Sequence, residues 1–435
     1  MDMESMERNG NKRIFQRLGG GPSSTSSYSR PKVCHFWLAG RCTKNPCSYL
    51  HSDPSDSSST SMAAPPKRIH QNLTYRRNPN PNPNGHSSNW GRGQGGGVVG
   101  ASRASLKEKV CNFWMAGKKC AYGEKCKYLH SWSVGDEISL LTRLEGHQKA
   151  ITGIALPSGS DKLYSGSKDG SVRVWDCQSG QCATVVNMGA EVGCLISEGP
   201  WVLVGIPNSI KVWNTQTVTE MSLSGPAGQV YAMAASNGML FAGTQDGNIL
   251  VWRFSPAGNC FEPAASLKGH SLAVVSLVVG ANRLYSSSMD NTIKVWDLGT
   301  LQCIQTLTDH TSVVMSVLCW DQFLLSCSLD QTIKIWAATE SGNLEVTYTH
   351  KEEHGLLSLS GMNDAQAKPV LLCSCNDNII RLYDLPSFAD RGKLISKEEV
   401  RALQLGPGGL FFSGDGTGEL RVWRWSANTT EVPPA

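Results

Sequence analysis

The chain has 435 residues, of which 40% are hydrophobic and 17% are charged, and 15 of them are cysteines. This length allows about three domains of ordinary size, or fewer if one of them is a large β architecture. The sequence contains no run of about 18 apolar residues and no hydrophobic segment near its amino terminus, so we expect neither a membrane span nor a secretory signal.

The net charge of +4 hides two oppositely charged parts. Residues 1–140 contain 20 Lys and Arg against 9 Asp and Glu, a net charge of +11, whereas the remaining 295 residues contain 20 against 27, a net charge of −7. A basic segment is the electrostatic footprint of a polyanionic partner, and we favour nucleic acid over a membrane surface because no amphipathic helix accompanies the charge. The alternative is a basic tail that serves only solubility.

Two short segments in the basic part repeat one pattern of three cysteines and one histidine. The predicted ligands are Cys34, Cys42, Cys47 and His51 in the spacing C-x7-C-x4-C-x3-H, and Cys111, Cys120, Cys126 and His130 in the spacing C-x8-C-x5-C-x3-H. Three thiolates and one imidazole complete a tetrahedral zinc shell. We therefore predict two structural Zn²⁺ ions, with a disulfide framework as the alternative.

We place finger 1 at residues 32–52 and finger 2 at residues 108–131. Modules this small bury too little apolar surface to fold alone, so zinc must supply most of their folding free energy. We expect Phe36 and Phe113 to pack over the zinc clusters. Trp37 and Trp114 should each keep one face of the indole exposed, for stacking or for a protein contact.

The segments around the fingers are poor in apolar residues. Residues 1–31 and the Ser-, Asn-, Pro- and Gly-rich linker 53–105 are predicted to be disordered, and residues 426–435 form a tail. The nine cysteines outside the fingers are scattered through apolar stretches, which is typical of reduced intracellular thiols.

The two fingers resemble the CCCH family of zinc fingers, of which the tristetraprolin-type proteins read single-stranded RNA. In that family bases stack on aromatic residues two positions after the second and third cysteines. The resemblance implies that finger 2 contacts RNA through two aromatic residues and four lysines, Tyr122, Tyr128, Lys118, Lys119, Lys125 and Lys127. For finger 1 it implies a smaller set, Tyr49, Arg41 and Lys44.

We expect finger 2 to be the better RNA binder, because Lys44 stands in finger 1 where Tyr122 stands in finger 2 and each base–aromatic stack contributes about 1–3 kcal/mol. The family's aromatic lead-in before the first cysteine is absent, so its preference for AU-rich RNA does not transfer. Because some CCCH fingers bind proteins, a protein contact remains the alternative.

From about residue 140 the sequence repeats with a period of about 40 residues. Alternating apolar strands end at Trp175, Trp213, Trp252, Trp296, Trp336, Tyr383 and Trp423. Several short strands in each of seven units predict a mostly β protein with a seven-bladed β-propeller at residues 138–425, preceded by the two fingers and disordered linkers.

These units resemble WD40 repeats. The resemblance implies buried hydrogen-bonded sets of His, Asp, Ser and Trp in three units, comprising His147, Asp169, Ser165 and Trp175; His270, Asp290, Ser286 and Trp296; and His310, Asp330, Ser326 and Trp336. Histidine next to serine and aspartate can signal catalysis, but a set that recurs once per blade indicates a structural role. Blades 2 and 3 lack the Gly-His pair, blade 6 ends in Tyr383, and blade 7 shifts its Asp415.

The chain reaches only the third strand of the last blade at Trp423, so residues 138–143 must supply the missing outer strand. In WD40 propellers this strand enters from the face opposite the Gly-His loops. We therefore expect finger 2 to be tethered near that opposite face, with finger 1 free to range.

The favoured function is an RNA-binding adaptor that recruits protein partners through the propeller, with no membrane and no small-molecule substrate. No P-loop, nucleophile elbow or paired carboxylates occur and each zinc shell is full, so we expect no enzyme activity. The alternatives are a DNA-binding, transcription-associated adaptor and a ubiquitin-ligase substrate receptor. The whole chain resembles the plant CCCH–WD-repeat proteins, which implies a nuclear location, with the cytoplasm as the alternative.

Overall fold

The computed structural model describes residues 109–135, 138–217, 219–364 and 366–425. Finger 1, with its ligands and its predicted RNA contacts Tyr49, Arg41 and Lys44, lies outside the described residues, as do segments 1–31, 53–105 and 426–435. Within the described ranges no helix is long and apolar enough to cross a membrane.

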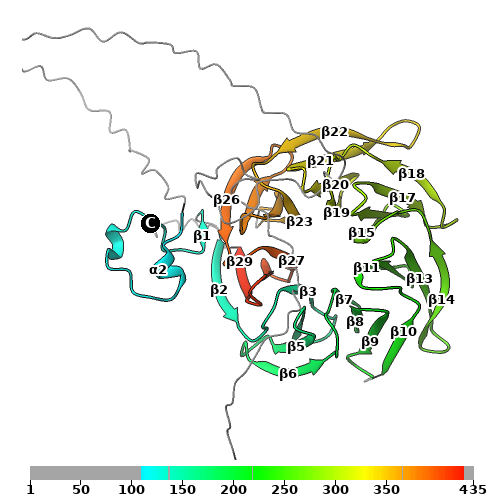
Figure 1. Ribbon diagram of the computed structural model, residues 1–435, viewed down its shortest axis with the longest axis horizontal. Coiled ribbons are helices and arrows are strands. Elements are labelled where there is room, and N and C mark those ends of the chain that lie inside the picture. The colour runs from blue at the N-terminus through cyan, green and yellow to red at the C-terminus, as the bar shows by residue number, and fades with distance from the viewer. Residues whose placement is uncertain (1–108, 136–137, 218, 365, 426–435) are drawn as a thin grey trace, which may run out of the picture. The chain divides into compact units, whose positions relative to one another are not determined.

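Seven antiparallel sheets are arranged as the blades of a ring, so the predicted seven-bladed propeller is confirmed (Figure 1). Blade 1 contains β3 (Ile151–Ala155), β4 (Lys162–Ser167), β5 (Ser171–Asp176) and β6 (Cys182–Asn187). Blade 2 contains β7 (Cys194–Glu198), β8 (Trp201–Ile206), β9 (Ser209–Asn214) and β10 (Glu220–Ser224). Blade 3 contains β11 (Val230–Ser236), β12 (Met239–Thr244), β13 (Ile249–Ser255) and β14 (Cys260–Leu267).

The remaining blades continue around the ring. Blade 4 contains β15 (Val274–Gly280), β16 (Arg283–Ser288), β17 (Ile293–Asp297) and β18 (Cys303–Leu307). Blade 5 contains β19 (Val314–Trp320), β20 (Phe323–Ser328), β21 (Thr332–Ala338) and β22 (Leu344–Lys351). Blade 6 contains β23 (Leu356–Asn363), β24 (Pro369–Cys375), β25 (Ile379–Asp384), β26 (Ala389–Ile395) and a fifth strand, β1 (Ser133–Val134). Blade 7 contains β27 (Val400–Leu405), β28 (Leu410–Asp415), β29 (Leu420–Trp425) and β2 (Ile138–Leu144).

The apolar alternation read from the sequence becomes packing between neighbouring blades. In β9 the buried positions are every second residue, among them Ile210 and Val212, whereas β8 is buried along its whole length. Val295 of blade 4 packs in one cluster with Val314 and Trp336 of blade 5. Each blade therefore completes the core of the next, and the ring is stable only when every neighbour is present.

β2 pairs with β29, from Ile138 opposite Trp425 to Leu144 opposite Leu420. β2, which comes before blade 1 in the chain, thus closes the last blade, as the sequence predicts. Without it the long edge of β29 would face solvent with unpaired backbone groups.

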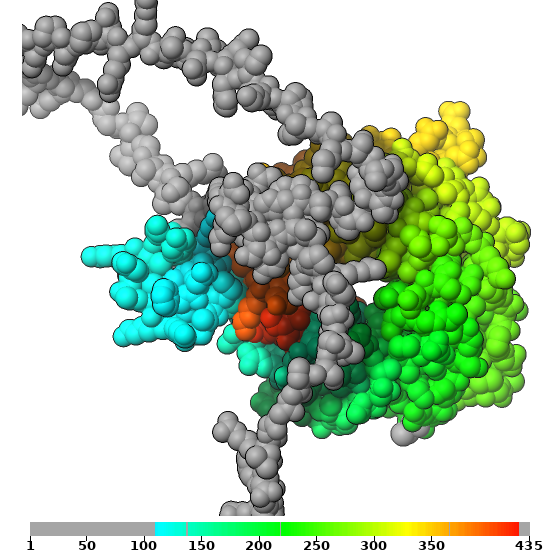
Figure 2. Space-filling view, viewed as in Figure 1, coloured from blue at the N-terminus to red at the C-terminus, as the bar shows by residue number. Residues whose placement is uncertain are grey.

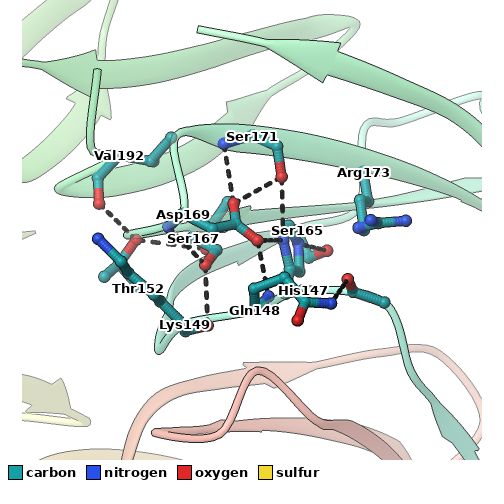
Figure 3. A network of polar contacts seen from close by, with 12 residues as sticks. His147, Gln148, Lys149, Thr152, Ser165, Ser167, Asp169, Ser171, Arg173 and Val192 are labelled. Atoms are coloured by element: carbon teal, nitrogen blue, oxygen red, sulfur yellow. Dashed lines mark hydrogen bonds and ion pairs between the residues drawn. The ribbon is translucent and has the colours of Figure 1, made fainter. Parts of the chain in front are cut away.

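The three His–Asp–Ser–Trp sets form as predicted. Figure 3 shows His147, Ser165 and Asp169 of the set in blade 1. In blade 1, His147 Nδ1 lies 2.9 Å from the Asp169 carboxylate, and Nε2 lies 2.9 Å from Ser165 Oγ. The Trp175 indole N–H donates to the same Oγ at 2.8 Å. Blades 4 and 5 repeat these bonds at 2.7 to 2.9 Å.

Burial lowers the pKa of both His147 and His270, although the neighbouring aspartates favour the protonated form. The imidazole rings are therefore neutral at physiological pH, and both of their nitrogens form structural hydrogen bonds.

Blade 6 replaces this arrangement with charges. Glu352 accepts a hydrogen bond from the Tyr383 hydroxyl and lies 3.4 Å from the Arg381 guanidinium. Arg381 also pairs with Asp377 at 2.8 Å. An acid–arginine network thus fills the space that histidine and tryptophan fill in blades 1, 4 and 5.

We predict that Ser286→Ala destabilises the propeller, because it removes the hydroxyl that joins His270 to Trp296 and leaves two buried groups without a partner. The expected loss is about 1–3 kcal/mol for each unpaired group, measured by chemical denaturation of the full chain. Ser271→Ala is the matched control, since this serine is exposed in the adjoining loop. Equal stability of the two variants would contradict a structural role for the set.

Candidate metal centre and nucleic-acid interface

The structure brings the four predicted ligands of finger 2 together. One donor atom from each of Cys111, Cys120, Cys126 and His130 lies within 4.8 Å of the others. Cys111 and Cys126 are buried, and the other two are half-buried. Three thiolates and one imidazole at this separation suit a tetrahedral Zn²⁺ ion.

Backbone hydrogen bonds hold this cluster in place. Helix α2 (Asn112–Met115) begins directly after Cys111, and the Met115 N–H donates to the Cys111 carbonyl at 2.8 Å. The 3-10 helix η1 (Gly123–Lys125) spans the loop before Cys126, whose N–H donates to the Gly123 carbonyl at 3.1 Å. The Cys111 N–H donates to the Leu129 carbonyl at 2.9 Å, which ties the first ligand beside the last.

Two observations fit a metal at this site. Nε2 of His130 is buried and finds no hydrogen-bond partner among the described residues, as expected of a coordinating nitrogen. A hydrogen bond from the Trp114 backbone N–H, with further help from His130, lowers the pKa of the Cys111 thiol to about 6. The Cys111 thiolate is therefore favoured before any ion binds. At Cys120 a backbone hydrogen bond at Tyr122 favours the thiolate, but burial and the two neighbouring thiols raise the pKa.

The residues predicted to contact RNA lie on the outside of finger 2. The side chains of Tyr122 and Tyr128 are 73% and 41% exposed. Lys118, Lys119, Lys125 and Lys127 are all exposed, and none of them forms an ion pair within the described part of the chain. The Lys127 ammonium lies 5.2 Å from the centre of the Tyr128 ring. Aromatic rings interleaved with unpaired cations are suited to bases and phosphates.

The two aromatic residues of α2 differ in how they contact the zinc cluster. Phe113, expected to pack over the zinc cluster, is 61% exposed, so that expectation is wrong. Trp114 instead stacks on His130, with the ring centres 6.1 Å apart and the planes at 5°. Consecutive helical residues diverge by about 100°, so only one of the two can face the cluster.

Trp132 is a contact that the sequence reading missed. Its ring centre lies 5.0 Å from that of Trp114, and it joins the buried core of blades 6 and 7 together with Leu394 and Trp423. The two fingers differ here: Trp132 follows His130 by two residues, whereas Asp53 holds the matching place after His51. A large aromatic residue directly after finger 2, absent after finger 1, was the sequence signal for this contact.

Finger 2 is not tethered at the face opposite the Gly-His loops, so that prediction is wrong. β1 pairs antiparallel with β26, and the Ile395 N–H donates to the Trp132 carbonyl at 2.8 Å. Ile395 is the last residue of β26 and therefore lies at the Gly-His end of that strand. β1 therefore carries the chain back along the rim before β2 begins, and Gly135, the residue after β1, has a φ of 115°.

Finger 2 consequently stands beside the rim of blades 6 and 7, where it forms a projection next to their strands (Figure 2). A groove of about 450 Å³ separates Asn112, Met115, Ala116 and Gly117 of the finger from Arg143 and Lys397 of the propeller. Lys397 lies in the loop that follows β26, on the same side as the Gly-His loops.

A zinc site of this composition beside a ring of WD40-type blades defines a CCCH zinc-finger protein with a WD40 propeller. The family model "Zinc finger C-x8-C-x5-C-x3-H type (and similar)" matches residues 106–131. The model "WD domain, G-beta repeat" matches residues 138–176, 261–297 and 301–337.

Relatives cover the whole architecture. "Zinc finger CCCH domain-containing protein 17" of Oryza sativa subsp. japonica is 64% identical over 98% of both chains. "Zinc finger CCCH domain-containing protein 48" of Arabidopsis thaliana is 60% identical over 97% of this chain and 98% of its own. The chain therefore belongs to this family of zinc finger CCCH domain-containing proteins with WD40 repeats.

Among solved structures, the WD40 β-propeller domain of Doa1 superposes with a TM-score of 0.58 over 67% of this chain and 97% of its own. At 20% sequence identity this likeness concerns the fold alone.

We predict that Cys126→Ser lowers the zinc content of the full chain by one ion, because a shell missing one thiolate binds zinc too weakly to survive purification. Elemental mass spectrometry measures the content. Cys177→Ser, which changes an exposed propeller cysteine, should leave it unchanged. An equal zinc content in the unaltered chain, Cys126→Ser and Cys177→Ser would refute the assignment of Cys126 as a zinc ligand.

Proposed function

We propose that the chain is an RNA-binding adaptor: finger 2 binds single-stranded RNA, and the propeller binds protein partners. Membership of the family supports the broader role, a nucleic-acid-binding and protein-interaction adaptor. The observation that carries the finer proposal is the pair of exposed tyrosines on finger 2, together with four exposed lysines that form no ion pair among the residues the structure describes.

Stacking separates single-stranded from duplex nucleic acid. A base can lie on Tyr122 or Tyr128 only if it is unstacked from its neighbours, which is the normal state of single strands and loops. Lysines alone attract the phosphates of any nucleic acid and give no such preference. We therefore favour single-stranded RNA over duplex DNA, and DNA binding becomes an outcome of the experiment.

We assign finger 1 a second zinc ion and a supporting role in RNA binding through Tyr49, Arg41 and Lys44. The proposal includes a nuclear location. It gives the chain no catalytic role, because the His–Asp–Ser sets are buried and a zinc shell of four protein ligands has no place for a reacting water. The supports are the charge of the amino-terminal part, the repeated ligand pattern and the buried sets.

We predict that Tyr122→Ala and Tyr128→Ala each weaken the binding of the full chain to single-stranded RNA by about fivefold to a hundredfold, which corresponds to the loss of one base–aromatic stack. Fluorescence anisotropy at one fixed salt concentration measures the dissociation constants. The same titrations with single-stranded DNA and duplex DNA show which polymer is preferred.

Tyr348→Ala is the matched control, because this tyrosine is 47% exposed on blade 5 and should not touch RNA. If neither finger variant changes the affinity, stacking by finger 2 is wrong. If duplex DNA binds more tightly than RNA, the DNA-binding alternative replaces the proposal.

A further inference from the structure

A continuous series of contacts joins the zinc site to the closing blade of the propeller. Trp114 stacks on the ligand His130 and lies 5.0 Å from Trp132, centre to centre. The Trp132 ring covers the guanidinium of Arg421, whose carbon lies 3.9 Å from the ring centre. Arg421 belongs to β29, the strand that β2 must pair with to close the ring.

Arg421 is the centre of a buried charged network in blade 7. Its side chain is 1% exposed, and it donates to the Glu419 carboxylate at 2.6 Å and to the Ile395 carbonyl at 2.5 Å. Lys397 and Arg143 lie 2.5 and 3.8 Å from the same carboxylate. Although burial opposes ionisation, the hydrogen bonds from Lys397 and Arg421 lower the pKa of Glu419. Three cations thus share one buried carboxylate.

Trp132 offsets this excess of positive charge with the face of its ring. One terminal nitrogen of Arg421, Nη2, is buried without a hydrogen-bond partner among the described residues. A cation–π contact is strongest where water is excluded, which is the case here. Blade 7 keeps the Trp–Ser bond of the histidine sets, from the Trp423 indole N–H to Ser413 Oγ at 2.8 Å, and its Arg421 is covered by Trp132, which precedes the propeller in the chain.

We propose that zinc binding by finger 2 stabilises the propeller locally where it closes, by holding β1 on β26 and Trp132 over Arg421. Zinc fixes His130, His130 and Trp114 hold Trp132 in place, and Trp132 holds β1 on β26 and covers Arg421. Loss of zinc unfolds the finger, because a module of this size has no other core. Trp132 then loses Trp114 and Met115, which pack against the core of blades 6 and 7. This inference requires no nucleic acid and stands apart from the RNA-binding proposal.

Hydrogen exchange of the full chain tests the coupling directly, with the Ile395 amide as the reporter because it donates to the Trp132 carbonyl. Chelation of zinc should accelerate exchange at Ile395 by about tenfold or more, as expected when a desolvated cation–π contact and its packing are lost. Amides of β9 in blade 2 and β21 in blade 5 should change little.

Two pairs of variants locate the effect. Cys126→Ser should reproduce the chelated state without a chelator, whereas Cys47→Ser, which removes a predicted ligand of finger 1, should leave Ile395 protected. In Trp132→Ala, and in the milder Trp114→Ala, chelation should no longer change the exchange rate at Ile395.

Unchanged protection of Ile395 after finger 2 has lost its zinc would overturn the proposal. An acceleration of the same size in blades 2 and 5 would also overturn it, because the effect would then be global rather than seated at the closing blades.

Discussion

Closure of the ring by β2 is the constraint on which the remaining structure depends. Every blade is covered by its two neighbours, so a propeller with an open seam would expose two blade faces and one strand edge. The pairing of Ile138–Leu144 with Leu420–Trp425 covers these two faces and pairs this edge. Because the closing strand comes from the amino-terminal side, whatever precedes it in the chain is brought to this seam, and here that segment is finger 2.

The sequence predicted the features that repeat. A period of about 40 residues sufficed for the blades, for the strand missing from the last blade and for the three histidine sets, because each depends on a local pattern that recurs. The four donors of finger 2 were equally visible, since a zinc shell requires fixed residue types at short spacing.

The sequence did not predict the features that occur once. The contact between Trp132 and Arg421 joins residues almost 290 positions apart in the sequence. The repeat places a basic residue at the position of Arg421 in most blades, but nothing in the repeat marks Trp132. The exposure of Phe113 and the partial burial of Trp114 depend on which side of α2 faces the propeller, and packing rather than residue type decides this. The tether was placed at the wrong face because β1, only two residues long, reverses the chain before β2.

Attachment of finger 2 to the rim has a consequence for binding strength. A finger on a flexible leash searches a large volume, and the effective concentration of one bound partner near another falls steeply with the length of the leash. A finger held at the rim beside blades 6 and 7 keeps its exposed rings at one fixed separation from the loops on the Gly-His side. A nucleic-acid strand bound at Tyr122 and Tyr128 and a protein bound on those loops would be held at a nearly constant distance and orientation. Their effective concentration with respect to each other would then depend on this fixed geometry and not on the length of a flexible linker.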